Sequence, residues 1–258
     1  MNRRNFLVSS LVAAPAAVNY ARAGQHGDHK QHYLEWIRFE VVNNAHRGPL
    51  LQFLGKVVIP GLNELGCEQI GLFRGKFGAH GGDVFMLVPH PSIQSFLTSW
   101  DKLAATEAFK SAADGPMDKP LYKRMDSTLM EAFTHMPKVE VPEAVKGKNG
   151  RIFEFRVYEA PNRIRGDLKV EMFNEGGEIE IFRKVGLDPV FFGKTLAGRL
   201  MPNLTYMLAF ENLEAQQEAW EKFFAHPDWN TLKANPRYKG TVSTISDNIL
   251  IPLNGSQI

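Results

Sequence analysis

Two stretches of the sequence decide the fold: KPLYKRMDSTLMEAF at residues 119–133 and NPRYKGTVSTISDNI at residues 235–249. Both read Pro-x-Tyr-Lys-x-x-x-Ser-Thr-aliphatic, starting from Pro120 in the first and from Pro236, 116 positions later, in the second. Self-similarity at a fixed spacing is the signature of a chain built from repeated units. The match therefore predicts that the chain contains two copies of one unit.

Four further matches upstream of these stretches keep the same order in both copies. They pair Arg38 with Arg156, Gly75 with Gly193, Met86 with Met207, and Trp100 with Trp220. Their offsets lie between 118 and 121 positions, a drift that loops of unequal length produce. The sequence thus predicts two tandem domains, residues 33–137 and 151–254, joined by a charged linker at residues 138–150.

Each copy predicts the same order of secondary structure. In FEFRVYE, residues 153–159, apolar side chains alternate with Glu154, Arg156 and Tyr158, which is the period of a strand. An interrupted helix, two strands, a second helix and a closing strand follow. The predicted helix interruptions fall at residues 59–61 and 175–177, the two strands at 69–77 and 84–88 or 189–195 and 204–210, and the closing strands at 129–133 and 248–250. The order β-α-β-β-α-β is that of a ferredoxin-like α+β fold.

The second copy resembles the NIPSNAP family, part of the dimeric α+β barrel superfamily. Three stretches resemble the family pattern: FEFRVYE, NEGGEIEIFRKVG at residues 174–186, and YMLAFENLEAQQEAWEKFFAHPDW at residues 206–229. The first copy departs from it, with Glu40 in the place of Tyr158 and no Pro-Asp-Trp ending. The resemblance implies two facing four-stranded sheets with helices outside and a cavity between them. Because one chain holds both copies, a pseudo-dimeric barrel within one molecule is expected.

The first strand of each copy carries the candidate ligand-binding residues. We expect its apolar face to pack on the helices, so that Glu154, Arg156 and Tyr158 point into the barrel, together with Arg38 of the first copy. The fork of donors on an arginine suits a carboxylate or another anion. The alternative is an internal ion pair between Arg156 and Glu154, since strand residues are often architectural. No catalytic residue is identified.

The first 23 residues read as a signal peptide. Arg3 and Arg4 precede x-Phe-Leu and a modest apolar run, and Ala21-Arg22-Ala23 is a small-x-small cleavage signature. The twin arginine resembles a Tat export signal, and an ordinary secretory signal is the alternative. The run is shorter than the roughly 20 apolar residues that span a bilayer. The sequence predicts export by the Tat pathway to the periplasm or the medium, with no membrane anchor after cleavage at Ala23.

Composition excludes several classes of function. Cys67 is the only cysteine, so neither an intrachain disulfide nor a thiolate zinc or iron–sulfur site is expected. The net charge of +2 comes from scattered basic residues and does not indicate nucleic-acid binding. Residues 24–32, predicted to be a flexible N-terminus, hold three histidines and one aspartate: His26, Asp28, His29 and His32. Their spacing suits a divalent metal, but nothing fixes their geometry, and we predict no metal site.

Two other motifs look functional at first sight. GKFGAHGGD, residues 75–83, is glycine-rich, but a strand follows it rather than a helix, so it predicts a hairpin loop carrying His80 and not a phosphate cradle. WEKFFAHPDW, residues 220–229, has the sister stretch WDKLAATEAF at residues 100–109, in which His226 and Asp228 have no counterpart. We interpret it as a helix ended by Pro227, with Trp229 packed on the turn.

Two functions from different classes remain open. The first is non-catalytic binding of a small apolar, aromatic or anionic ligand in the barrel cavity, or support of a partner complex, including a homo-oligomer. The second is an enzyme of the barrel superfamily, monooxygenase-like or haem-handling, in which Arg156 or Tyr158 polarises an oxygenated substrate. The resemblance implies haem only through this second class. A scaffold without any ligand is the third reading.

Overall fold

The computed structural model describes residues 31–258 except 78–81 and 114–119, and its elements follow the predicted order twice. The first half comprises β1 (Tyr33–Glu40), α1 (Asn44–Phe53), the π-helical turn η1 (Leu54–Val58), α2 (Ile59–Glu64), β2 (Gly71–Gly75), β3 (Val84–His90), α3 (Ile93–Ala104), α4 (Glu107–Ala113) and β4 (Arg124–Ala132). The second half comprises β5 (Ile152–Glu159), α5 (Arg163–Phe173), α6 (Glu178–Val185), β6 (Asp188–Ala197), β7 (Asn203–Phe210), α7 (Leu213–Ala225), α8 (Pro227–Ala234), the 3-10 turn η2 (Pro236–Tyr238) and β8 (Thr244–Pro252).

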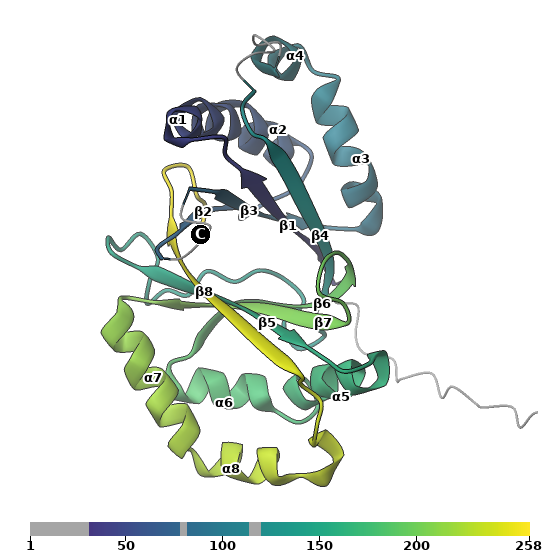
Figure 1. Ribbon diagram of the computed structural model, residues 1–258, viewed down its shortest axis with the longest axis vertical. Coiled ribbons are helices and arrows are strands. Elements are labelled where there is room, and N and C mark those ends of the chain that lie inside the picture. The colour runs from purple at the N-terminus through teal and green to yellow at the C-terminus, as the bar shows by residue number, and fades with distance from the viewer. Residues whose placement is uncertain (1–30, 78–81, 114–119) are drawn as a thin grey trace, which may run out of the picture.

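The strands form one closed barrel in the order β1-β3-β2-β8-β5-β7-β6-β4. Every neighbouring pair is antiparallel. Four strands come from each half, and the halves meet where β2 pairs with β8 and where β4 pairs with β6. Figure 1 shows the helices of the first half above the barrel and those of the second half below it. The predicted α+β fold with facing sheets in a pseudo-dimeric barrel is therefore confirmed.

The strand registers define which residues of the two halves correspond. Glu35 lies opposite Leu129 of β4, and Glu154 lies opposite Ile249 of β8, so the halves are related by about 119 to 120 positions. Arg38 therefore corresponds to Val157, one residue beyond Arg156. The sequence match of Arg38 with Arg156, at an offset of 118, is out of register by one residue. A slip of one residue moves a strand's side chains to the opposite face of the sheet.

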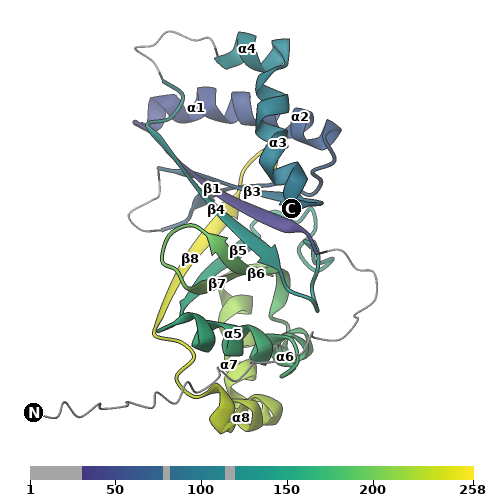
Figure 2. The same cartoon turned by 90° about the vertical axis from the view of Figure 1, so that its right-hand side faces the viewer.

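The barrel interior is filled by apolar side chains. Trp36 of β1 stacks on Phe155 of β5 with ring centroids 4.2 Å apart, and on Phe85 at 5.6 Å. Other buried members of this interior cluster are Leu34, Phe73, Leu87, Met130, Phe153, Phe191, Met207 and Leu250. The segment between the halves and the last residue of the chain also join this cluster, through Val139, Val145 and Ile258. Figure 2 shows the strands of the barrel between the helices of the first half and those of the second half.

Two helix boundaries test the local predictions. The predicted break at 175–177 is observed, because Gly177 adopts a φ of +82° between α5 and α6, a conformation that suits glycine. The predicted break at 59–61 is wrong: the first-half helix continues from α1 through η1 into α2. Pro60 lies just after η1, and its missing N–H leaves a backbone carbonyl of the preceding turn without its usual partner, at the point where the helix widens to the π-helical form.

The interpretation of residues 220–229 as a helix terminator is confirmed. α7 ends at Ala225 and α8 begins at Pro227, with His226 in an extended conformation between them. His226 Nδ1 accepts a hydrogen bond from the Asp228 backbone N–H at 3.2 Å, so it acts as the N-cap of α8. Trp229 packs on Phe223 at 4.5 Å. Along the residues described, no helix is both long and apolar enough to span a membrane.

Candidate functional site

The candidate residues on β5 face the helices, and the predicted direction is therefore wrong. Phe153 and Phe155 belong to the barrel interior, whereas Tyr158 packs on the aromatic cluster under α5, α6 and α7. The prediction assumed that helices cover the apolar face of the strand. In this closed barrel both faces of β5 are covered, and its more apolar face, with Phe153 and Phe155, lies inside the barrel. Glu154, Arg156 and Tyr158 do lie together, as predicted.

Glu154 is the centre of this group. Its side chain is buried and accepts three hydrogen bonds: from Arg156 Nη1 at 2.5 Å, from Trp220 Nε1 at 2.7 Å and from Gln216 Nε2 at 3.0 Å. The ion pair with Arg156 is the internal pairing that the sequence left as an alternative. A carboxylate with three donors is well compensated for its burial.

Arg156 lies in an aromatic setting. Its guanidinium carbon is 4.6 Å from the ring centre of Trp220 and 5.6 Å from that of Tyr158. Burial disfavours its charged form, but Tyr206, Tyr158 and Glu154 outweigh burial and hold the pKa of Arg156 above its ordinary value. Its Nε is buried and, within the described part of the chain, has no hydrogen-bond partner. The positive charge of Arg156 is thus held in place, while its Nε–H has no acceptor in the described structure.

Two tyrosines close the other side of Arg156. The Tyr206 hydroxyl donates to the Tyr158 hydroxyl at 2.8 Å, and burial raises the pKa of both phenols. Both hydroxyls therefore stay protonated at neutral pH. We call Glu154, Arg156, Tyr158 and Tyr206 the β5 polar cluster.

A buried ion pair lies next to the β5 polar cluster. Lys169 Nζ of α5 is 2.7 Å from Glu178 Oε2 of α6, and both side chains are almost fully buried. Burial raises the pKa of Glu178, against the opposing influence of Lys169. Lys169 also lies over the ring of Phe173, at 4.6 Å.

Arg38 lies apart from the β5 polar cluster. It shares the interior face of β1 with Leu34 and Trp36, so it lies at one end of the barrel. Its Nε donates to Asp83 at 2.7 Å, and its Nη1 is 3.5 Å from Asp126. Two carboxylates therefore already compensate this arginine, which disfavours a further anion there.

The family comparison assigns the half of the chain that carries the β5 polar cluster. Residues 153–257 match the NIPSNAP family model. The second half is therefore similar to the NIPSNAP family, and we call it the NIPSNAP domain for this similarity. Among proteins of curated function, none matches the chain. A NIPSNAP-like domain protein from Burkholderia xenovorans is 24% identical over 40% of this chain and 86% of its own, with a TM-score of 0.34.

Two solved structures resemble the whole barrel. One is a protein described as a monooxygenase from Lactobacillus acidophilus, with a TM-score of 0.57 and 10% identity, covering 86% of this chain and 94% of that one. The other, from Fusobacterium nucleatum and described in the same way, has a TM-score of 0.54 and 10% identity, covering 86% of this chain and 93% of that one. At these identities the similarity shows the fold alone.

The barrel between the NIPSNAP domain and the first half does not fit a haem. Its aromatic rings already meet at stacking distance, as Trp36 and Phe155 do at 4.2 Å. In the described ranges, no group of three potential metal ligands occurs.

Several predicted residues lie outside the described residues. These are the signal residues Arg3, Arg4 and Ala23, the N-terminal metal candidates His26, Asp28 and His29, and His80 in the hairpin loop between β2 and β3. His32 is described; burial, reinforced by the nearby Lys138, lowers its pKa below the usual value.

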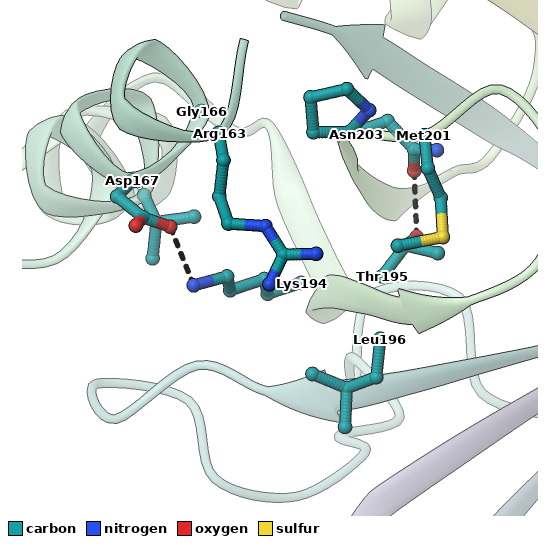
Figure 3. A pocket seen from close by; sticks show the side chains of 10 residues that line it. Arg163, Gly166, Asp167, Lys194, Thr195, Leu196, Met201 and Asn203 are labelled. Carbon is teal, nitrogen blue, oxygen red and sulfur yellow. Dashed lines mark hydrogen bonds and ion pairs between the residues drawn. The ribbon is translucent and has the colours of Figure 1, made fainter.

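A small pocket on the NIPSNAP domain escaped the sequence analysis. It lies between the start of α5 and the β6–β7 hairpin, has a volume of about 110 Å³, and includes the Asp167–Lys194 ion pair (2.5 Å) and a hydrogen bond from Thr195 to Asn203 (2.6 Å). Figure 3 shows the Arg163 guanidinium extending toward Lys194. Pockets for organic ligands usually measure about 300–1,000 Å³. Nothing in the sequence indicates this pocket, because its residues come from three separate elements that only the fold brings together.

Proposed function

We propose that this is an exported, non-catalytic binding protein whose NIPSNAP domain holds a small planar anion at Arg156. Export rests on the twin arginine and the cleavage signature of the first 23 residues. Fractionating cells that express the full chain and its Arg3→Lys/Arg4→Lys double variant tests it. The wild type is expected in the periplasm and the variant in the cytoplasm. Equal export of both would favour the ordinary secretory route.

The exposed part of the Arg156 side chain carries the binding proposal. A guanidinium offers five N–H donors in a planar fork, and Glu154 accepts one of them at Nη1. Nε is buried, so a ligand would meet the 16% of the side chain that remains exposed. An arginine that is anchored by one carboxylate and partly exposed is suited to a second carboxylate or enolate.

The surroundings of Arg156 favour a ligand that is also flat and apolar. Trp220 and Tyr158 present ring faces to the guanidinium. On neighbouring β8, Asp247 lies opposite Arg156 in the register and is exposed, and Ile245, opposite Tyr158, is 47% exposed. Solvent therefore reaches the group from the β8 side, past Asp247 and Ile245. Because the barrel interior is filled, the expected ligand site lies on the helix side of the sheet and not in the barrel.

Calorimetric titration with benzoate and with neutral benzyl alcohol tests this proposal. We expect benzoate to bind and benzyl alcohol to bind much more weakly, because only the anion uses the guanidinium. Arg156→Gln should weaken benzoate by at least about tenfold, which corresponds to roughly 1.4 kcal/mol. Arg156→Lys should fall between, since it keeps the charge and loses the planar fork.

Arg183→Gln is the matched control, because Arg183 pairs with Glu140 on the exposed surface. It should bind benzoate like the wild type. Circular dichroism checks that each variant is folded. If the folded wild type does not bind benzoate, or if folded Arg156→Gln binds it unchanged, the proposal is wrong.

The paired tyrosines favour one second candidate, an enzyme that polarises an oxygenated substrate at the same place. Tyr158 and Tyr206 stay protonated beside Arg156, so the group combines a fixed cation with phenolic proton donors. An oxygen electrode separates the two functions. Ligand-dependent oxygen uptake that Tyr158→Phe abolishes would favour the enzyme, and binding without uptake favours the binding protein.

A further inference from the structure

The first half contains a polar relay of its own, on the helix side of β1. Cys67 Sγ lies 3.5 Å from His90 Nδ1, and His90 Nε2 lies 3.2 Å from Glu35 Oε2. Cys67 and His90 have no exposed surface, and Glu35 is 3% exposed. The three residues come from the loop after α2, from β3 and from β1. Their spacing in the sequence gives no sign of this contact.

The hydrogen bonds that Glu35 accepts show which ring nitrogen of His90 is a donor. Glu35 accepts from Trp100 Nε1 at 2.9 Å and from Ser127 Oγ at 2.6 Å, which a carboxylate does best when ionised. His90 Nε2 is then the donor to Glu35, so His90 Nδ1 faces the sulfur of Cys67. Burial opposes the charged imidazole, but hydrogen bonds with Cys67 and Glu35 outweigh it and raise the pKa of His90 to about 9.

This order of groups is that of an activated nucleophile. A thiol contacts a base, and a carboxylate orients the base through its other nitrogen. One proton lies between Cys67 Sγ and His90 Nδ1. Ser95 Oγ is 3.3 Å from the same nitrogen and 3.7 Å from the sulfur, so a hydroxyl also borders the pair.

The second half shows that the fold does not require the relay. There the glutamate and tryptophan recur, with Trp220 donating to Glu154 as Trp100 donates to Glu35. In the strand registers, His90 is opposite Tyr33 and Phe210 is opposite Ile152. Phenylalanine therefore fills the place of His90 in the second half, inside an apolar cluster. The histidine and the cysteine are additions to a shared framework.

Only a very small reactant can reach this sulfur. Cys67 is buried, but its chain neighbours Gly66, Glu68 and Gln69 are exposed, so the thiol lies directly beneath a surface loop. Phe96 covers His90 edge-on at 5.5 Å. This geometry disfavours large substrates, so the reactant must be close to water in size and must enter past the surface loop.

We propose that Cys67 is an oxidation site for hydrogen peroxide, with His90 as its base and Glu35 as a positioning residue. The sulfur attacks one peroxide oxygen, the S–O bond forms and the O–O bond breaks. The proton between Cys67 and His90 passes to the leaving hydroxide, which departs as water. Sulfur is oxidised by two electrons to sulfenic acid, and the peroxide is reduced. With no second cysteine in the chain, an external thiol must reverse the reaction.

The test exposes the folded protein to hydrogen peroxide, removes the peroxide with catalase, and then unfolds the chain in guanidinium with dimedone, so that burial does not limit trapping of the sulfenic acid. Mass spectrometry should find the adduct on Cys67, formed faster than when the chain is unfolded before it meets the peroxide. His90→Phe, which copies Phe210 of the second half, should slow adduct formation at least about tenfold. Iodoacetamide, which is larger, measures exposure and should label Cys67 slowly in the wild type and in the variant.

The ratio of the peroxide rate to the iodoacetamide rate separates a change in the reactivity of the Cys67 thiol from a change in its accessibility. If His90→Phe opens the fold, both rates rise, and Glu35→Gln becomes the test: it should lower the peroxide rate while iodoacetamide labelling stays slow. Two outcomes contradict the proposal. One is a folded variant, either His90→Phe or Glu35→Gln, that reacts with peroxide as fast as the wild type. The other is a wild-type thiol that reacts more slowly than the unfolded chain.

Discussion

The charge on His90 links the stability of the first half to pH. Its pKa in the folded protein is about 9, above the ordinary value of 6.5. A raised folded pKa adds stability that is fully present below pH 6.5 and is lost as the pH rises toward 9. The loss amounts to about 3.5 kcal/mol at most, because one pKa unit corresponds to roughly 1.4 kcal/mol.

Denaturant unfolding of the wild type and of His90→Phe across this pH range measures that loss. The difference between the two proteins cancels the contributions of the other titrating groups. We expect the stability of the wild type relative to the variant to fall between pH 6.5 and 9. A difference that stays constant over this range would show that His90 remains neutral in the folded protein.

Single residues also show where reasoning from the sequence succeeds and fails. Glu154, Arg156 and Tyr158 could be grouped because alternate residues of one strand share a face. The relay of Glu35, Cys67 and His90 could not be predicted, because each residue comes from a different segment and only the folded sheet brings them together. The same holds for Tyr206, which reaches Tyr158 from the neighbouring strand.

At the scale of elements, the seam between β4 and β6 depends on a glycine. Gly193 faces Ala132 across this seam, and a Cβ built on Gly193 would lie 2.9 Å from the Met130 Cβ. Gly193→Ala should destabilise the protein by about 1–3 kcal/mol, because the seam has no room to move. Chemical denaturation measures the change.

Gly55→Ala in η1 is the matched control for this substitution. A Cβ on Gly55 meets nothing within 4 Å, and alanine is the better helix former. It should be neutral or stabilise by up to about 1 kcal/mol. If both variants lost the same stability, the close contact at the seam would not be the cause.

The strands show why the type of each element could be predicted, whereas the side of the sheet that packs on the helices could not. Alternation identified β5 correctly, and turn residues placed the β2–β3 hairpin. Which face of β5 meets the helices depends on the whole barrel, where the other half presents Trp36 to Phe155. The closing strands begin earlier than predicted, at Arg124 and Thr244, because their first residues are polar and only backbone pairing with β1 and β5 reveals them.

At the scale of the whole molecule, each half supplies the strands and the apolar face that the other half needs to close the barrel. The second half alone would expose the interior faces of Phe153, Phe155 and Phe191, now buried or nearly so. It would also leave β6 and β8 without the neighbours they have in β4 and β2. Unpaired strand edges beside an apolar face drive self-association.

We therefore expect residues 151–258, expressed alone, to form a homodimer in which a second copy takes the place of the first half. Native mass spectrometry should give twice the mass of the fragment. Phe155→Asp should abolish the dimer, because the ring of Phe155 meets the partner at the barrel centre and a carboxylate buried there has no counter-charge. Leu213→Asp, on the exposed surface of α7, should leave the dimer intact. A folded, monomeric fragment would mean that the barrel interior is not what holds the two halves together, and that the segment joining them does so instead.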